Sequence, residues 1–285
     1  MKLLRVEYKK IVGNKSFKVF TIMFLVFLPL LVFLVPSMIK FPFQGLEFHP
    51  LIPINYQTSW YAVTLISSWF CFFLLSFVLI YHITNEYNYR TVRQNIIDGF
   101  TRNDYLLGKL YLMLAITILA TLYVLIIGIA GGLYFSTFEQ QEDNVIQEFF
   151  KLGAESDVQA GFGSLFDGIS NVLRFFVQTL ATFSFAFLIA FLTKRGILAV
   201  LVFYASFIAE KIARWQFSEN GMDVIADYFP LHNIANTLPF PGMTSLITGI
   251  NSPMFINWTY LGLSMIYAVV FIFLTRLVFY KRDIS

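Results

Sequence analysis

The chain has 285 residues, of which 58% are hydrophobic, 19% aromatic and only 13% charged, and its net charge is +3. Soluble domains carry roughly 25% charged residues, so this composition indicates a membrane protein without a large soluble domain. The small net charge argues against nucleic acid as a partner. The single cysteine, Cys71, excludes a disulfide within the chain and a cysteine metal site.

Residues 1–14 predict a basic amphipathic helix. In a helical projection the apolar residues fall on one arc and the basic residues on the opposite arc: Leu4, Tyr8, Ile11 and Val12 against Lys2, Arg5 and Lys9. Gly13 and Asn14 end this pattern. We expect the helix to lie on the inner membrane surface before the chain enters the bilayer.

Six apolar segments follow that can cross a membrane. A bilayer core of about 30 Å requires about 20 apolar residues in a helix, and the segments that meet or nearly meet this length are Phe17–Val35, Trp60–Ile83, Tyr105–Phe135, Ile169–Leu192, Ile197–Arg214 and Ile256–Phe279. The third segment is longer than a straight crossing needs, so it must tilt, protrude into the cytosol, or bend near its glycines at 128, 131 and 132. The sequence therefore predicts an all-α polytopic fold, with residues 1–285 as a single transmembrane domain.

The distribution of Lys and Arg sets the expected orientation. With the N-terminus inside the cell, 15 of the 20 Lys and Arg residues fall in cytosolic segments and 5 fall on or near the other side. The positive-inside rule then places both termini in the cytosol and the protein in the inner (cytoplasmic) membrane. It also places the polar segment 84–104, between the second and third spans, inside the cell.

Two outer segments have different characters. Residues 136–168 hold seven acidic residues against one basic residue, Lys151, and we interpret them as a solvated acidic loop in preference to a binding site for an outer partner. In residues 215–255, prolines interrupt several short apolar pieces. Because proline prevents a continuous helix, we expect short re-entrant helices that dip into the outer leaflet and return.

No catalytic, cofactor-binding or metal-binding motif is present. The stretch "LLGKL" at 106–110 ends like a phosphate-binding loop, but it lacks the first glycine of that motif and the Ser or Thr that would hold Mg²⁺. His49, His82 and His232 lie in different segments without metal-ligand spacing. Ionisable residues are absent from the middle of spans one to four and six, which argues against a carrier that is powered by an ion gradient.

The segment 84–104 predicts a short cytosolic helix. Val92, Ile96 and Phe100 recur at four-residue spacing, and Gly99 is a natural helix stop. Helices joined directly need a connection of only two to eight residues, whereas this connection is longer and patterned. We therefore expect the short helix to dock with a partner.

Local pairs support this interpretation of the segment. Glu86 and Arg90 can pair at i,i+4. Thr101, with Asp104 three residues later, forms a variant capping box that begins the helix of the third span. The predicted geometry is a short helix that a sharp turn holds between two transmembrane helices.

Glu86 followed by "YRTVRQNIIDGFTRNDYLLGKL" resembles the coupling-helix region of permease subunits of type-2 ATP-binding-cassette exporters. That region shows an acidic residue, a Gly/Arg-Thr pair, a G-x-[ST]-R turn and a Gly-Lys pair, and the matching positions are Glu86, Arg90, Thr91, Gly99, Thr101, Arg102, Gly108 and Lys109. The layout of an amphipathic N-terminal helix, six spans and re-entrant outer helices is also similar to this family. The enlarged acidic loop departs from the commonest pattern and leaves the substrate class open.

The resemblance implies that two permeases, identical or homologous, enclose a substrate pathway in the lipid membrane. A separate ATPase subunit, which would hold ATP and Mg²⁺, would dock on residues of the short helix and its flanks: Glu86, Arg90, Val92, Arg93, Ile96, Gly99 and Arg102. We expect Val92 and Ile96 to fill an apolar cleft of that ATPase and Arg93 to meet its acidic groups. Glu210 and Arg214, at the far end of the fifth span, are candidates for an outer gate.

The alternative is a membrane scaffold that transports nothing and recruits a partner through the acidic outer loop. A scaffold would keep its function when the short helix is altered, whereas an exporter would lose it. Lipids, peptides, polymers, drugs and ions all remain open as substrates. The sequence also leaves open whether the two permeases are identical.

Overall fold

The computed structural model describes residues 2–33, 40–41, 49–50, 56–89, 91–97, 99–136, 165–238 and 258–281. The helices in these ranges are α1 (Lys2–Gly13), α2 (Lys15–Phe33), α4 (Tyr56–Phe70), the π-helix η1 (Cys71–Leu75), α5 (Ser76–Asn88), α6 (Thr91–Ile97), α7 (Arg102–Ser136), α9 (Leu165–Thr193), α10 (Gly196–Glu219), α11 (Asp223–Asp227), α12 (Pro230–Ala235) and α14 (Trp258–Lys281). The strands in the same ranges are β1 (Lys40–Phe41) and β2 (His49–Pro50), which pair antiparallel.

The described part of the chain contains six helical segments that are long and apolar enough to cross a membrane. They are Lys15–Phe33, Val63–Asn88, Arg102–Tyr134, Gly168–Thr193, Gly196–Glu219 and Trp258–Lys281. Each overlaps one predicted span, so the prediction of a helical, multi-pass membrane fold is confirmed. Apart from the two-residue pair of β1 and β2, the described elements are helical, as expected.

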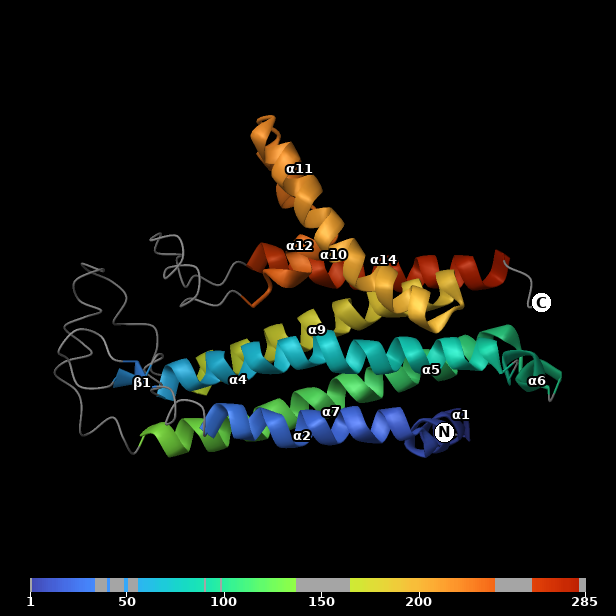
Figure 1. Ribbon diagram of the computed structural model, residues 1–285, viewed down its shortest axis with the longest axis horizontal. Helices are drawn as coiled ribbons and strands as arrows, with labels where there is room; N and C mark the ends of the chain where they lie inside the picture. Colours follow the sequence, from blue (N-terminus) through green and yellow to red (C-terminus); the bar gives the residue numbers. More distant parts are fainter. Residues whose placement is uncertain are drawn as a thin grey trace.

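Helix α9 is the core of the helix bundle. It contacts α4, α5, α7, α10 and α14, and 83% of its apolar stretch is buried inside the protein, against 17% for α2. Phe175, Phe183, Phe187 and Phe191 of α9 are fully buried. Apart from α10, the long helices lie roughly along one direction, and the two chain ends, at α1 and α14, lie toward the same end of the bundle (Figure 1).

The third predicted span is one unbroken helix. α7 has 35 residues, which at 1.5 Å per residue is about 52 Å, well beyond the roughly 30 Å of a bilayer core. The glycines at 128, 131 and 132 lie within the helix and do not interrupt it. A bend near these glycines was one of three predicted alternatives, beside a tilt and a protrusion into the cytosol, and α7 continues through them as one helix.

The second span contains a π-helical turn. η1 joins α4 to α5, and the hydroxyl of Ser76 donates to the carbonyl of Cys71 at 3.0 Å. The hydroxyl of Tyr204, from α10, donates to the carbonyl of Phe73 at 2.8 Å. The carbonyl of Cys71 also accepts the backbone N–H of Ser76, which is the i→i+5 bond of a π-helical turn. The two hydroxyls therefore add donors where the second span changes its pitch.

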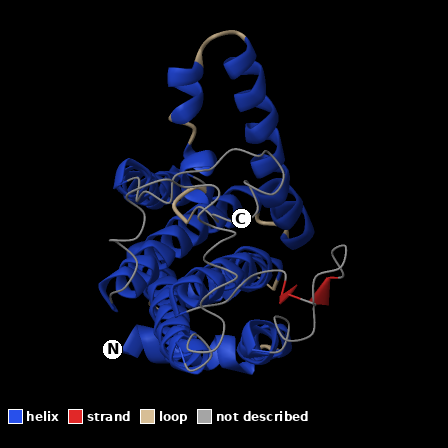
Figure 2. Cartoon of the chain, turned by 90° about the vertical axis from the view of Figure 1, so that its left-hand side faces the viewer, coloured by secondary structure: helices blue, strands red, loops and turns tan. Residues whose placement is uncertain are grey.

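Helix α10 leaves the bundle. Only 11% of its apolar stretch is buried, and its outer half, with α11, stands away from the other helices in both views (Figures 1 and 2). The chain returns through α12, which contacts α14. Helices α11 and α12 fall within the predicted re-entrant segment, but residues 239–257 of that segment lie outside the described ranges.

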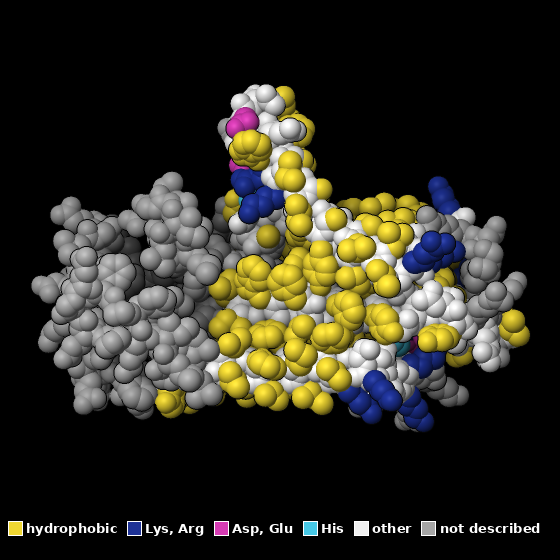
Figure 3. Space-filling model, in the orientation of Figure 1, with side chains coloured by type: hydrophobic (Ala, Val, Ile, Leu, Met, Phe, Trp, Pro, Cys, Tyr) yellow, Lys and Arg dark blue, Asp and Glu magenta, His cyan; other side chains and the backbone are white. Residues whose placement is uncertain are grey.

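The surface of the described helices is divided by chemistry. Hydrophobic side chains cover the middle of the face seen in Figure 3, and Lys and Arg side chains gather toward the end at which α1 lies. This is the pattern of a surface that meets lipid in its middle and water at its end. Residues 137–164, which hold most of the predicted acidic loop, lie outside the described ranges.

Candidate functional site: a buried charge cluster beside the short helix

The connection between the second and third spans folds as its local sequence predicts. α5 ends at Asn88, the short helix α6 follows, and exposed Gly99 turns the chain with a φ of +97°. The side chain of Thr101 accepts the N–H of Asp104 at 3.1 Å, and the carboxylate of Asp104 accepts the N–H of Thr101 at 3.1 Å. The predicted glycine stop and capping box are therefore confirmed, because each helix end finds its expected partner.

A buried ammonium group lies beside this connection. Lys109 of α7 is only 1% exposed. Its Nζ lies 2.5 Å from Oε2 of Glu7, 2.9 Å from Oε1 of Glu86 and 3.2 Å from Nε2 of His82. An ammonium has three N–H donors and no acceptor, and these three atoms lie within reach of its donors. Nε2 of His82 accepts from Lys109 only in the tautomer that carries its proton on Nδ1, whereas a protonated Nε2 donates to Glu7 instead.

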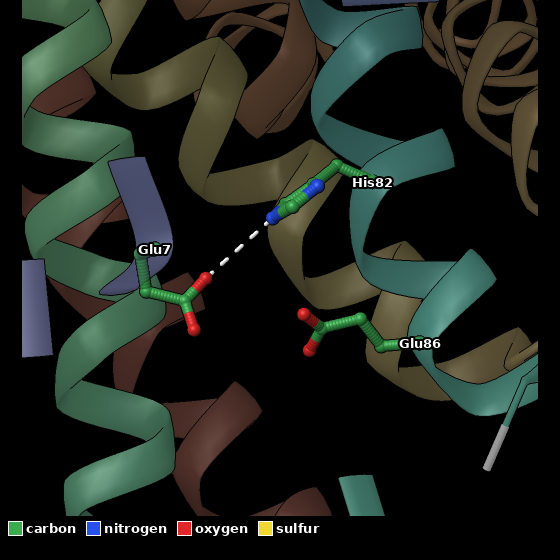
Figure 4. Close-up of side chains that lie close together, drawn as sticks. All are labelled: Glu7, His82 and Glu86. Atoms are coloured by element: carbon green, nitrogen blue, oxygen red, sulfur yellow. Dashed lines mark ion pairs between the residues drawn. The ribbon is translucent and has the colours of Figure 1, made fainter. Parts of the chain in front are cut away.

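Two helices supply the groups around the ammonium of Lys109, which itself belongs to a third helix, α7. Glu7 comes from α1, while His82 and Glu86 stand one turn apart on α5, and all three point toward a common centre (Figure 4). Nε2 of His82 lies 3.5 Å from Oε2 of Glu7, which is the pair that the dashed line marks in Figure 4. The hydroxyl of Tyr105, one turn before Lys109, donates to Oε2 of Glu86 at 2.8 Å. We call Glu7, His82, Glu86, Tyr105 and Lys109 the charge cluster.

The electrostatics of the charge cluster keep Glu7 ionised. Burial alone would raise the pKa of Glu7, but contacts with His82 and Lys109 outweigh burial and lower the pKa from its usual 4.5 to about 2. Lys10 adds a second positive charge, at 3.6 Å from Glu7 and 3.3 Å from Glu86. Two carboxylates and two ammonium groups therefore balance one another in a place that is largely closed to water.

The cluster contains three donor groups of the kind that bind metal ions. One oxygen each of Glu7 and Glu86 and one nitrogen of His82 lie within 4.8 Å of one another. The ammonium of Lys109 already lies at hydrogen-bond distance from all three residues, so a divalent cation would have to displace it. The arrangement is therefore an internal ion-pair network, and the geometry favours a joint between helices over a metal centre.

The short helix α6 is attached to this network. The hydroxyl of Thr91 donates to the carbonyl of Glu86 at 3.2 Å, and Nζ of Lys10 lies 3.5 Å from the amide oxygen of Asn95. The side chain of Val92 is 1% exposed and belongs to the hydrophobic core. Movement of α6 would therefore displace contacts made by α1, α5 and α7 together.

Two residues predicted to dock a partner face the protein interior instead. Val92 packs into the chain's own core, and Glu86 is 7% exposed and paired with Lys109. The burial of these two side chains does not favour contact with an ATPase, because Val92 attaches α6 to the core and Glu86, on α5, is paired with Lys109. Docking at these two positions stays a prediction. Arg90 lies outside the described residues, as do the side chains of Arg93 and Ile96.

The two remaining docking candidates are accessible or partly accessible. Gly99 is exposed. Arg102 is half-buried, and its Nη1 lies 3.4 Å from the carbonyl oxygen of Tyr280 near the end of α14. Contact of these two residues with a partner stays a prediction. In the structure, Arg102 links the start of α7 to the end of α14.

The outer gate candidates hold the projecting part of α10 in place. Oε1 of Glu210 accepts the backbone N–H of His232 at the start of α12. Nη2 of Arg214 lies 3.2 Å from Oδ1 of Asp227 in α11, and the two side chains are 38% and 55% exposed. Glu210 therefore has a partner in α12 and Arg214 has one in α11, and a gating role stays a prediction.

The sequence pattern did not reveal Glu7, His82 and Tyr105 as members of one site. Glu7 was not singled out, because the helical pattern of residues 1–14 is defined by apolar and basic residues. It is nevertheless the single acidic residue before the first span. His82 was interpreted as an isolated histidine. A signal was available, because His82 and Glu86, and likewise Tyr105 and Lys109, are spaced at i,i+4, which places each pair on one helix face.

Fold and site together define a six-span helical membrane protein with a buried ionic joint beside a short connecting helix. The chain belongs to the family described as protein of unknown function (DUF2705), whose family model matches residues 19–285. The match begins within α2, after the helix that carries Glu7, and covers the remainder of the first span and the other five spans. Neither a curated protein nor a solved structure matches the chain.

Proposed function

We propose that this chain is the permease subunit of a type-2 ATP-binding-cassette exporter, driven by a separate ATPase subunit that docks at α6. The observation that carries the proposal is the ordered short helix α6, which stands at one end of the bundle and is attached to a buried ionic joint between three other helices. Most connections in compact proteins are short, and longer ones are usually functional. An ordered connection of this length therefore favours a partner that binds at α6. ATP and Mg²⁺ would be held by the ATPase.

The exposed side chains of α6, and of the residue just before it, are the candidates for the docking surface. Ile97, the last residue of α6, is 77% exposed, and Tyr89, just before α6, is 76% exposed. Large apolar side chains on a polar, water-facing end of a membrane protein are candidates for a protein interface. We propose that Tyr89 and Ile97, together with exposed Gln94, contact the ATPase in place of Val92 and Glu86.

The charge cluster gives this docking a mechanical consequence. A force on α6 reaches Glu86 through Thr91 and reaches Lys10 through Asn95. Because Lys109 binds Glu7 and Glu86 at once, α1, α5 and α7 would move as one unit. Coupling of this kind needs packed, discretely bonded contacts between the two sites, and the cluster supplies them.

A second permease, identical or homologous, would complete the pathway. The apolar stretch of α10 is 11% buried, and Ile208, Ile212 and Trp215 on its outer half are exposed. Glu210 and Arg214 have partners within the chain, so the apolar side chains are what a partner permease would cover on this half of α10.

Association with an ATPase tests the proposal. We would compare Tyr89→Ala and Ile97→Ala with Ile197→Ala, a matched control because Ile197 is 82% exposed at the same end of the bundle, in the first turn of α10. Loss of a buried anchor residue typically costs about 1–3 kcal/mol, or about 5- to 150-fold in affinity. Tyr89→Ala and Ile97→Ala should each lose co-purified ATPase at unchanged membrane abundance, and Ile197→Ala should not.

The outcome also separates the exporter from the scaffold. Equal ATPase recovery with Tyr89→Ala, Ile97→Ala and Ile197→Ala, or a functional complex that contains no ATPase, would refute the exporter. A scaffold would instead lose its partner when the acidic outer loop is altered.

A further inference from the structure

We propose that the lysines of α1 and of the first turn of α2 bind anionic phospholipid headgroups in the leaflet that they face. Lys9, Lys15 and Lys18 are exposed and lie within ten residues of one another. We call these three residues the lysine surface. They belong to the end of the molecule at which Lys and Arg side chains gather in Figure 3. The inference does not depend on the proposed transport function.

The fold removes the acidic charge that would otherwise neutralise this surface. Glu7 is the single acidic residue before the first span. Its side chain is 6% exposed and paired with Lys109 inside the protein. Lys10 is partly exposed and also turns toward Glu7 and Glu86. What α1 presents outward among its described side chains is therefore positive charge without a compensating carboxylate.

The position along α2 identifies a lipid headgroup as the occupant. Lys15, Val19 and Ile22 follow one another at i,i+4 and i,i+7, so they share one face of the helix. Val19 is 55% and Ile22 is 58% exposed, and an exposed apolar face on a membrane-spanning helix faces lipid. The ammonium of Lys15 therefore stands at the depth where acyl chains give way to phosphate groups, with Lys18 in the same turn.

The junction of the two helices holds the surface in one arrangement. Asn14 alone separates α1 from α2, and its side-chain oxygen accepts the N–H of Ser16 at 3.0 Å. α1 is fixed from the other side because Ile11 is 1% exposed and Glu7 binds Lys109. Lys9 is therefore held near the first turn of α2, and basic groups grouped near a membrane surface attract anionic lipids.

A lipid titration of the delipidated, full-length protein tests the proposal. Native mass spectrometry would count phosphatidylglycerol and, separately, phosphatidylcholine molecules bound to the parent and to the variant Lys9→Gln/Lys15→Gln/Lys18→Gln. A lysine near a membrane surface contributes about fivefold in affinity, so the triple variant should bind phosphatidylglycerol about 100-fold more weakly. Binding of phosphatidylcholine should be the same in both proteins.

Two controls make the result decisive. The charge-conserving variant Lys9→Arg/Lys15→Arg/Lys18→Arg should retain the parent affinity. Arg195→Gln/Arg276→Gln/Lys281→Gln, which removes three exposed basic residues at the same end on other helices, should lose less than about fivefold. Should the glutamine variant fail to fold, the parent's preference for phosphatidylglycerol and its loss at high salt decide the question. Equal binding of both lipids, or equal losses in both glutamine variants, would overturn the proposal.

Discussion

Two ion-pair systems occupy opposite parts of this molecule, and they differ in what surrounds them. Lys109 pairs with Glu7 and Glu86 where all three side chains are between 1% and 8% exposed. Arg214 pairs with Asp227 where the side chains are 38% and 55% exposed. Water screens the Arg214–Asp227 pair and has little access to the pairs of Lys109. Loss of one charged partner should therefore change the free energy of unfolding more at the buried pairs than at the exposed pair.

This difference in exposure shows which ion pairs fix the packing of the helices. Removing one member of a buried pair leaves a charge without water or a partner, whereas an exposed charge is simply hydrated. The charge cluster therefore fixes α1 and α7 on α5. The Arg214–Asp227 pair only assists a hairpin that the remainder of its contacts already define.

The largest effect is expected for Lys109→Met. The substitution keeps an unbranched chain of similar length but leaves the carboxylates of Glu7 and Glu86 with only Lys10 for charge balance. Breaking a buried pair in this way costs about 3–5 kcal/mol. The thermal midpoint of aggregation in detergent should fall strongly relative to the parent, while Lys281→Met, at an exposed lysine, should leave it nearly unchanged. A similar small shift in both variants would show that the cluster does not stabilise the fold.

Acid should weaken the same joint within a defined window. The pKa of Glu7 is lowered from 4.5 to about 2 in the folded protein, so the unfolded chain binds a proton at Glu7 before the folded chain does. The stability that Glu7 contributes is therefore fully present above about pH 4.5 and is lost as the pH falls toward 2. Thermal midpoints between pH 5 and 2.5 should decline more steeply for the parent than for Glu7→Gln. Parallel declines would contradict this assignment.

A smaller loss is expected for Tyr105→Phe. The change removes only the hydroxyl that donates to Glu86 at 2.8 Å, and the ring keeps its stacking contact with Phe279. A hydrogen bond to a charged group contributes about 1.5–3 kcal/mol. Tyr280→Phe, at a 42% exposed tyrosine in the last turn of α14, is the matched control in the same thermal assay. Equal midpoints for the two variants would remove Tyr105 from the cluster.

The smallest effect is expected for Arg214→Gln. Exposed ion pairs contribute about 0–1 kcal/mol, so the thermal midpoint should change by little more than the error of the measurement. A change as large as that of Lys109→Met would mean that the hairpin of α10 and α11 is shielded from water, as it would be beneath a second permease. Repeating the measurement at high salt, which screens an exposed pair, distinguishes these cases.

The sequence predicted those features that depend on local pattern. The six spans follow from runs of apolar residues, and the end of α6 and the start of α7 follow from Gly99 and the pair Thr101–Asp104. The interior position of Val92 could not be predicted in this way, because a four-residue apolar spacing does not say which body covers that face. The pattern favoured a partner, whereas the face packs on the chain itself.

Most of the charge cluster could not be predicted from the sequence, because its contacts join residues that are far apart along the chain. Glu7 and Lys109 are 102 positions apart, and their pairing depends on how α1 folds back on α7. Glu86 was singled out through its i,i+4 spacing with Arg90 and through the family resemblance, and Lys109 through the resemblance. Neither observation predicts that the two residues pair with each other. The π-helical turn at Cys71–Leu75 was also outside sequence reasoning, because the donor from Tyr204 that supports it comes from another helix.

Site-specific crosslinking tests the central claim, that α6 presents a docking surface to an ATPase, most directly. A photoreactive phenylalanine analogue would replace Ile97 in one variant and Ile197 in another, and cells would be irradiated before membranes are solubilised. The account predicts a crosslinked product at position 97 that contains this chain and a protein with nucleotide-binding motifs, and none at position 197. Absence of that product at position 97, with both variants normally abundant, would contradict it.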